Sequence, residues 1–385
     1  MFKVQKHGEN YVMDAGTASG VEVGDEFTLY KEPDPSQKSS LLGIFVVREF
    51  RMSRVTLVPL CGASRFQFHM SAFALQTKSG TRHDLRVYAA NRKRLASPLE
   101  ALVREMHHVR PDRPRILRVE KELAGLGVDL DGRMVVFDIL DESVTAFNVR
   151  RIPYSIKPDV SVLRRILYAA AHFYWYLHVH PVEDQFCIQN KVQLELNEVK
   201  QVEGKYDDDL KPVMEQSGDN LNHNGVINLV ADPQDMYGIT ILNNSSTSLY
   251  MALFYFDISN LSISTYPTCL IQSIDLFFLL ALLYQSPFPG QSKMDSPLHP
   301  NRSMKLGYGS GDEAPFVYTI NKSQDLEVGF LKLFLSTEYV DLLHIPQLSP
   351  FTSICPIYNA ELLPLALTST LMWNTITVTV VLHKG

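Results

Sequence analysis

Cysteine is scarce in this chain, and long apolar runs are missing. Its four cysteines, none of them in a Cys-x-x-Cys pair, exclude a disulfide framework and favour a reducing compartment. The longest apolar stretch, LFFLLALLY at 276–284, is too short for a membrane-spanning helix, which needs about 20 residues. The N-terminal MFKVQKHGENY has no apolar core of the kind that marks a signal peptide. We therefore expect a cytoplasmic protein without a membrane partner.

A strong excess of one charge sign is also missing. The formal net charge of the 385 residues is −6, so no global field indicates a nucleic-acid partner. Basic residues gather within 82–121, for example in Arg92-Lys93-Arg94, but few aromatic residues alternate with them as a stacking platform for single-stranded nucleic acid requires. We interpret this segment as a solvated face. The alternative is that it docks the acidic segment 203–219 or an acidic protein partner.

The pattern of apolar residues predicts an α+β chain that is predominantly β. In residues 1–80, short alternating runs such as Phe27-Thr28-Leu29-Tyr30 stand between glycine turns, which indicates a small β-domain resembling a barrel. Residues 226–385 contain many short runs of β-branched and aromatic residues separated by turn clusters, which is typical of a β-sandwich. Between these parts we expect an α+β domain at 81–200 and an acidic linker at 201–225.

Local signals predict individual elements. The capping box Ser97-Pro98-Leu99-Glu100 predicts a helix with proline at its first position, and the apolar stripe after Asp159 predicts a longer helix. Asp131-Gly132 predicts the turn of a hairpin. In the C-terminal part we expect strands at Val226–Val230, Tyr237–Leu242, Leu249–Phe256, Leu261–Tyr266, Met304–Tyr308, Phe316–Ile320, Phe330–Leu335 and Thr375–Leu382.

Several motifs, taken in order, resemble one known family. They are GVEVGDEFTLY (20–30), AAAHFYWYL (169–177), LYMALFYFD (249–257), KLGYGSG (305–311) and DLEVGFLKLFLSTEYVDL (325–342). Together they resemble the region that follows the protease unit in large fungal caspase-domain proteins, and the resemblance covers nearly the whole chain. The C-terminal part also resembles a β-domain that is attached to bacterial caspase-like proteins. No single motif among them has a known chemistry.

The resemblance implies that catalysis belongs to another unit. In the family, a caspase-like unit supplies a His in a Ser-Gly-His-Gly context as base and a Cys in an Asp-x-Cys-x-Ser-Gly context as nucleophile. Neither motif occurs in this sequence. We therefore expect a non-catalytic accessory region that positions or regulates such a unit, which is its expected protein partner. The segments 269–294 and 352–370 depart from the family pattern, and we interpret both as unspliced or misassembled coding sequence.

One pair of residues imitates a caspase dyad. His7-Gly8 precedes Cys61-Gly62 at a spacing close to that of caspase signatures, which is about 50 residues. The surroundings differ, because charged and polar residues replace the apolar strand before the histidine and the upstream Asp of the cysteine motif is missing. We favour the interpretation that Cys61 packs as a small hydrophobe at a strand end. The alternatives are a diverged cysteine hydrolase that uses Cys61 and His7, and a gene fragment without independent function.

Metal and phosphate sites have less support than ordinary structural interpretations. His178-x-His180 lacks a third ligand nearby and stands where histidine is favourable, at a helix C-terminus, and we interpret His107-His108 in the same way. The glycine-rich 307–311 lacks the following helix and the Lys of a phosphate loop, so we interpret it as a turn. Asp207-Asp208-Asp209 lacks the spacing of an EF-hand loop. We expect neither a metal nor a cofactor.

Overall fold

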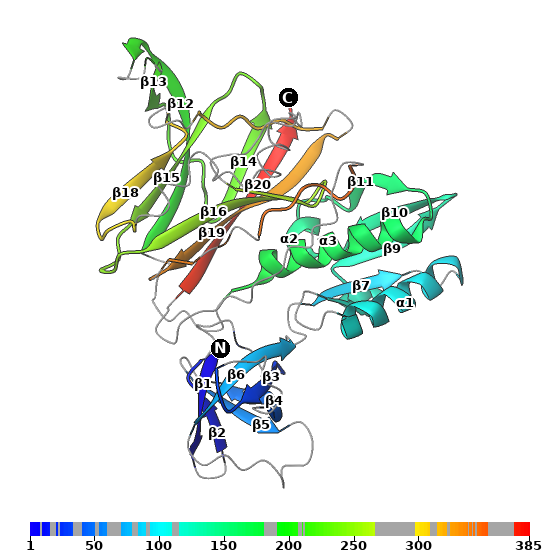
Figure 1. Cartoon of the computed structure of the whole chain (residues 1–385). Coiled ribbons are helices and arrows are strands. Elements are labelled where there is room, and N and C mark those ends of the chain that lie inside the picture. The colour runs from blue at the N-terminus through cyan, green and yellow to red at the C-terminus, as the bar shows by residue number, and fades with distance from the viewer. Residues whose placement is uncertain are drawn as a thin grey trace.

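A computed structural model describes most of the chain (Figure 1). The described residues are 1–7, 10–15, 21, 24–33, 41–50, 54–59, 71–78, 84–89, 93–109, 115–180, 191–206, 210, 212–265, 297–308, 314–321, 324–337, 339–340, 342, 345–352 and 373–385. Strands dominate among them, as the sequence predicts. The segment 269–294 and most of 352–370, which the sequence marks as departures from the family pattern, lie outside the described residues.

A closed barrel occupies the N-terminal part of the chain. Its strand order is β1-β2-β5-β4-β3-β6, and β6 pairs with β1 to close the ring. Alternate side chains point inward, so that Val4, Phe27, Leu29, Phe45 and Leu57 are buried in its core. The predicted small barrel is confirmed. Its strands are β1 (Phe2–His7), β2 (Asn10–Met13), β3 (Glu26–Tyr30), β4 (Leu41–Phe50), β5 (Val55–Pro59) and β6 (Ser71–Lys78).

A mixed sheet with helices follows the barrel. Its strand order is β11-β10-β9-β7-β8. The predicted hairpin turn is confirmed, because β9 and β10 pair Asp131 with Met134 and the intervening Gly132 has a φ of 60°, which glycine adopts without strain. The elements are β7 (Leu85–Ala89), α1 (Lys93–Val109), β8 (Ile116–Arg118), the 3-10 helix η4 (Lys121–Leu123), β9 (Leu126–Asp131), β10 (Met134–Ile139), α2 (Glu142–Thr145), β11 (Arg151–Ile156) and α3 (Val160–His178).

Helix α1 forms but begins earlier than its capping box predicts. It starts at Lys93, so Pro98 lies inside the helix rather than at its first position. A proline inside a helix removes one backbone hydrogen bond. Leu99, Leu102 and Met106 are buried in the main core, which is the hydrophobic cluster shared by α1, the mixed sheet, α3 and the strands β16 (Tyr250–Asp257) and β19 (Leu326–Ser336). This apolar burial offsets the lost bond.

The acidic segment 201–225 is not the linker that its composition predicts. Strand β12 (Val192–Tyr206) crosses the expected boundary and forms a hairpin with β13 (Pro212–Gln216). The first half of β12 buries Val192, Leu194 and Leu196, whereas side chains in its second half face solvent. Acidic composition indicates which side chains are solvated. It does not indicate whether the backbone beneath them is paired, and the prediction was wrong for this reason.

The C-terminal part of the chain forms facing sheets. The sheet β13-β12-β15-β18 faces the sheet β14-β20-β19-β16-β17, and buried side chains such as Ile241, Leu253, Leu333 and Val380 fill the space between them. The strands are β14 (Val226–Ala231), β15 (Tyr237–Asn243), β16 (Tyr250–Asp257), β17 (Ser262–Thr265), β18 (Arg302–Leu306), β19 (Leu326–Ser336) and β20 (Trp373–Lys384).

The segment Phe316–Ile320, predicted as a strand, is extended but joins no ladder. Phe316 forms an isolated bridge with Tyr237, in which each N–H donates to the other residue's C=O. Phe316 and Tyr318 are both buried in the core between the facing sheets. The alternation that predicts a strand is therefore real, but it reflects an extended segment that crosses the end of β15 and anchors alternate side chains.

Helix α3 joins the mixed sheet to the C-terminal sheets. It lies beside β9 and β10 and close to β16 and β19 (Figure 1), and the largest hydrophobic cluster contains residues from all of these elements. The predicted apolar stripe is buried, and so are Phe173 and Tyr176, because the helix is covered on more than one side. The ring of Phe173 meets that of Phe256 edge to face at 5.4 Å. The division of the chain at 1–80, 81–200 and 226–385 stays a prediction.

Candidate functional site

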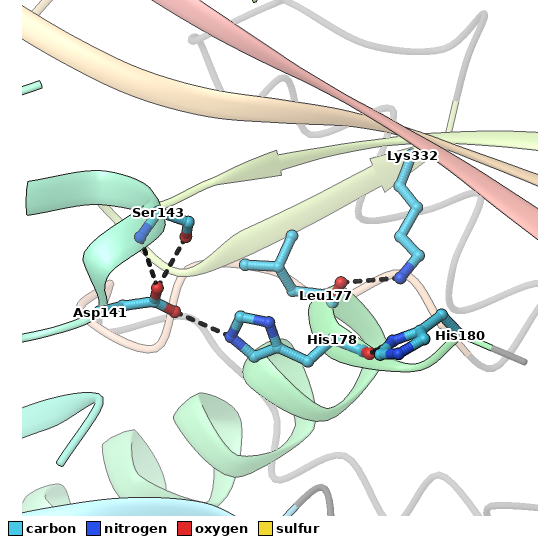
Figure 2. A network of polar contacts seen from close by, with 6 residues as sticks. All are labelled: Asp141, Ser143, Leu177, His178, His180 and Lys332. Atoms are coloured by element: carbon cyan, nitrogen blue, oxygen red, sulfur yellow. Dashed lines mark hydrogen bonds and ion pairs between the residues drawn. The ribbon is translucent and has the colours of Figure 1, made fainter. Parts of the chain in front are cut away.

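A buried lysine marks the contact between α3 and the C-terminal sheets. Lys332 lies in the central strand β19, on the side where Val328, Phe330 and Phe334 face the main core. Its side chain is nearly fully covered, with 1% of the residue exposed. Figure 2 shows the Lys332 ammonium beside the end of α3. A fully buried lysine is rare unless its charge has partners, so its surroundings decide its role.

Lys332 caps the C-terminus of α3. Its Nζ donates hydrogen bonds to the carbonyl oxygens of Leu177 at 2.7 Å and Val179 at 2.6 Å (Figure 2 draws the first). The last carbonyls of a helix have no partners within it, and the partial negative charge there attracts a cation. Nζ also lies 5.4 Å from the centre of the Phe334 ring. The lysine thus ties α3 to β19 across the main core.

Burial sets the protonation of this amine. Removal of the ammonium from water lowers the pKa of Lys332 from 10.5 to about 7. A lysine with such a pKa can act as a nucleophile or base where substrate reaches it. Here the amine is covered, and its hydrogen bonds to Leu177 and Val179 go to backbone carbonyls of α3 and its cap. This geometry is that of a structural cap.

A second polar group holds the other side of the same helix end. Asp141 Oδ1 accepts hydrogen bonds from the N–H of Ser143 at 2.9 Å and from its Oγ at 2.7 Å, which caps α2. His178 Nε2 lies 2.8 Å from Asp141 Oδ2 (Figure 2). Burial raises the pKa of Asp141, but the hydrogen bond and the charge of His178 and the bonds from Ser143 outweigh it, and the net pKa is lowered.

The Ser143–Asp141–His178 set has the wrong order for a hydrolase. A serine nucleophile must bond to the histidine that removes its proton, and the aspartate must orient that histidine from its other side. Here Ser143 bonds to Asp141, which lies between it and His178. The set joins the start of α2 to the end of α3. His180 turns away, with its Nδ1 2.6 Å from the carbonyl oxygen of His178.

The half-buried Asp257 at the end of β16 and the buried Glu327 at the start of β19 form a pair of carboxyl groups. Asp257 accepts hydrogen bonds from Ser259 N at 2.9 Å, Ser259 Oγ at 2.6 Å and Asn260 Nδ2 at 2.6 Å, and these close the turn before β17. Glu327 Oε1 accepts from Asn321 N at 2.8 Å. Burial, followed by the charge of Asp257, raises the pKa of Glu327 to about 7, and burial also raises that of Asp257. Both carboxyl groups bind neighbouring backbone.

Of the two residues proposed as a dyad, the structure places one. His7 is the exposed last residue of β1 and pairs with Asn10 across the turn to β2. Cys61 lies outside the described residues. Strand β2 pairs Tyr11 with Leu57, so β5 ends with Pro59 at the same end of the barrel as His7. The dyad therefore stays a prediction.

Of the remaining candidates from the sequence, some lie within the described residues and others lie outside them. Within the described residues, no group of three His, Cys, Asp or Glu is placed to hold a metal ion. Asp207-Asp208-Asp209 and 309–313 lie outside those residues. Gly307, at the start of the suspected turn, has a φ of 77°, and a Cβ there would lie 2.7 Å from the Phe316 ring. Close aromatic packing therefore requires glycine at this position.

Sequence reasoning missed Lys332, although a signal was present. Its strand reads VGFLKLFL, in which one lysine interrupts an apolar run whose every other position is expected to be buried. A cation in such a run must either reach the surface or find acceptors inside the protein. The identity of those acceptors could not be predicted, because they belong to backbone about 150 residues away in sequence.

Comparisons with known proteins found no family model, no curated protein and no solved structure that matches this chain. In the described part of the chain, no helix has the length and apolar character needed to cross a membrane.

Proposed function

We propose that this chain is a non-catalytic interaction region of a caspase-like protein. It consists of a small β-barrel, an α+β unit and a C-terminal β-sandwich, and it positions or regulates a cysteine endopeptidase unit. The observation that carries the proposal is the use of the buried Lys332 amine as a cap for α3. The Lys332 amine, a group that could serve catalysis elsewhere, here joins β19 to the end of α3.

Other polar contacts also connect α3 to the C-terminal part of the chain. Gln347 Nε2 donates to the carbonyl oxygens of Ala169, in α3, at 3.1 Å and of Leu261, beside β17, at 2.7 Å. His172 Nε2 lies 2.9 Å from the carbonyl oxygen of Ile345. Together with the shared hydrophobic cluster, these contacts hold α3 against the C-terminal sheets. Elements packed together in this way suit a region that holds another unit in place.

A direct binding measurement tests the proposal. The full chain is titrated by calorimetry with a caspase-like unit that carries the Ser-Gly-His-Gly and Asp-x-Cys-x-Ser-Gly motifs, with its cysteine replaced by alanine to prevent cleavage. We expect a saturable complex, and an unrelated cysteine protease inactivated in the same way is the control. Absence of binding to the caspase-like unit, or equal binding to the control, would refute the proposed role.

The second candidate function is a diverged cysteine hydrolase that uses Cys61 and His7. It is favoured by one observation, namely that His7 and the end of β5 lie at the same end of the barrel. A thiol-reactive peptide probe decides between the two functions. Labelling of Cys61 that disappears in His7→Ala, together with peptide hydrolysis lost in Cys61→Ala, would establish the hydrolase and remove the non-catalytic role.

A further inference from the structure

Strand β14 leaves backbone groups without partners at the margin of its sheet. In the parallel ladder with β20, the N–H of Thr379 donates to the carbonyl of Gly225. Because successive residues of a strand alternate in the side to which their backbone groups point, Ile227 and Leu229 face β20. Asn228 and Val230 face away from it. In the described part of the chain, the N–H and C=O groups of these two residues have no hydrogen-bond partner.

This margin also lacks the features that usually prevent strands from pairing at an edge. Such edges carry charged residues or proline, or are covered by another segment. The sequence of β14, VINLVA, contains neither a charge nor a proline, and Val230 is 55% exposed. Other edge strands of the described sheets are protected: β13 by Pro212 and Glu215, β18 by Arg302 and Lys305, β11 by Arg151 and Pro153, β8 by Arg118, and β17 by the pairing of Ile263 with Gln347.

We propose that β14 pairs in antiparallel orientation with β14 of a second copy of this chain, with the twofold axis at Leu229. In this register Asn228 of each copy lies opposite Val230 of the other, and each such pair exchanges N–H···O bonds in both directions. The free groups of one copy therefore complement those of the other. Leu229 lies opposite its own counterpart on the buried face, and the sheets of both copies become one continuous sheet.

The backbone around β14 selects this register over its neighbour. An axis at Asn228 would require the backbone groups of Val226, but these are already bonded to His223 in both directions. The axis at Leu229 uses only the residues whose groups are free. Side chains keep their faces in this pairing, because residues directly opposite each other in an antiparallel pair point to the same side of the sheet.

Charge and apolar content favour a second copy over a charged peptide as the occupant. The strand is uncharged, so that pairing with itself brings no like charges together. At each end, His223 occupies the position beside Val226, so the paired segment stops there and Asp232 of the second copy comes next to His223. An exposed carboxylate therefore approaches an exposed imidazole at both ends of the paired strands.

Sedimentation equilibrium of the full chain tests the pairing. A strand pair buries less than the area of about 1,000 Å² that stable interfaces exceed, so the series extends to about 1 mM protein. We expect a reversible monomer–dimer equilibrium. Val230→Pro removes an outward N–H that the ladder with β20 does not use, and it should abolish the dimer, whereas Val230→Thr keeps the N–H and should retain it. Circular dichroism confirms that each variant is folded.

Charge variants test the register even if the proline variant fails to fold. Asn228→Lys with Val230→Lys places like charges directly opposite each other, and Asn228→Glu with Val230→Lys places opposite charges there. We expect the dissociation constant of the first to exceed that of the second at least about tenfold. A chain that stays monomeric throughout the series, equal dissociation constants for the charge variants, or a folded Val230→Pro dimer would overturn the proposal. Binding of an extended peptide by a monomer would do so as well.

Discussion

Lys332→Met exposes the energetic role of the buried cap. Methionine matches the length of lysine but has no ionisable group, so the variant removes both the titration and the two hydrogen bonds to Leu177 and Val179. Burial lowers the pKa of Lys332 from 10.5 to about 7, so between these pH values the unfolded chain binds a proton that the folded chain does not. Stability of the wild type therefore rises with pH across this window.

The magnitude follows from the size of the pKa difference. Each pKa unit corresponds to about 1.4 kcal/mol, so the full window is worth about 5 kcal/mol, of which about 2 kcal/mol appears between pH 7 and pH 9. At pH 7 the variant loses the two hydrogen bonds, which lowers its free energy of unfolding by about 1–3 kcal/mol for each carbonyl left without a donor. It also avoids the cost of deprotonating a lysine on folding, which raises its free energy of unfolding. These effects nearly cancel, so the slope with pH is the more informative quantity.

Urea unfolding at pH 7, 8 and 9 measures that slope. We expect the free energy of unfolding of the wild type, relative to Lys332→Met, to increase by about 2 kcal/mol over this range. The titration of Glu327 contributes equally to both proteins, so it cancels in the difference between their free energies of unfolding. Lys200→Met, at an exposed position in β12, is the matched control and should follow the wild type in parallel. A difference between wild type and Lys332→Met that does not change with pH would refute the reasoning.

Three further variants test other contacts. The pKa of Glu327 is raised to about 7. Its stabilising contribution is therefore complete below about pH 4.5 and is lost as pH rises to 7. Glu327→Gln should remove this decline of the free energy of unfolding, measured by urea titration at several pH values. Asp159→Ala removes the cap of α3 and should lower the urea midpoint, whereas Asp159→Ser should nearly restore it. Gly329→Ala brings a Cβ against the Tyr255 ring and should cost at least about 1–3 kcal/mol, and Tyr255→Leu should reduce that loss in the double variant. A Gly329→Ala midpoint equal to that of the wild type would contradict the packing.

Local periodicity was sufficient to predict much of the fold. The barrel follows from short alternating runs, α3 from its apolar stripe and its cap at Asp159, and the β9–β10 hairpin from Asp131-Gly132. These features depend on residues within a few positions of one another, because turns, caps and alternation are properties of short segments. Where a boundary depended on packing elsewhere, as for α1 and for Phe316–Ile320, the sequence prediction was wrong or incomplete.

Tertiary structure alone decided which segments meet. The sequence identifies a lysine in an apolar strand, but only the docking of α3 on β19 supplies the carbonyls of Leu177 and Val179 as its acceptors. Likewise, the letters VINLVA predict a strand, but only the order of strands in the sheet leaves Asn228 and Val230 at its edge. Pairing between distant segments depends on register and packing across the whole core, and no local pattern contains that information.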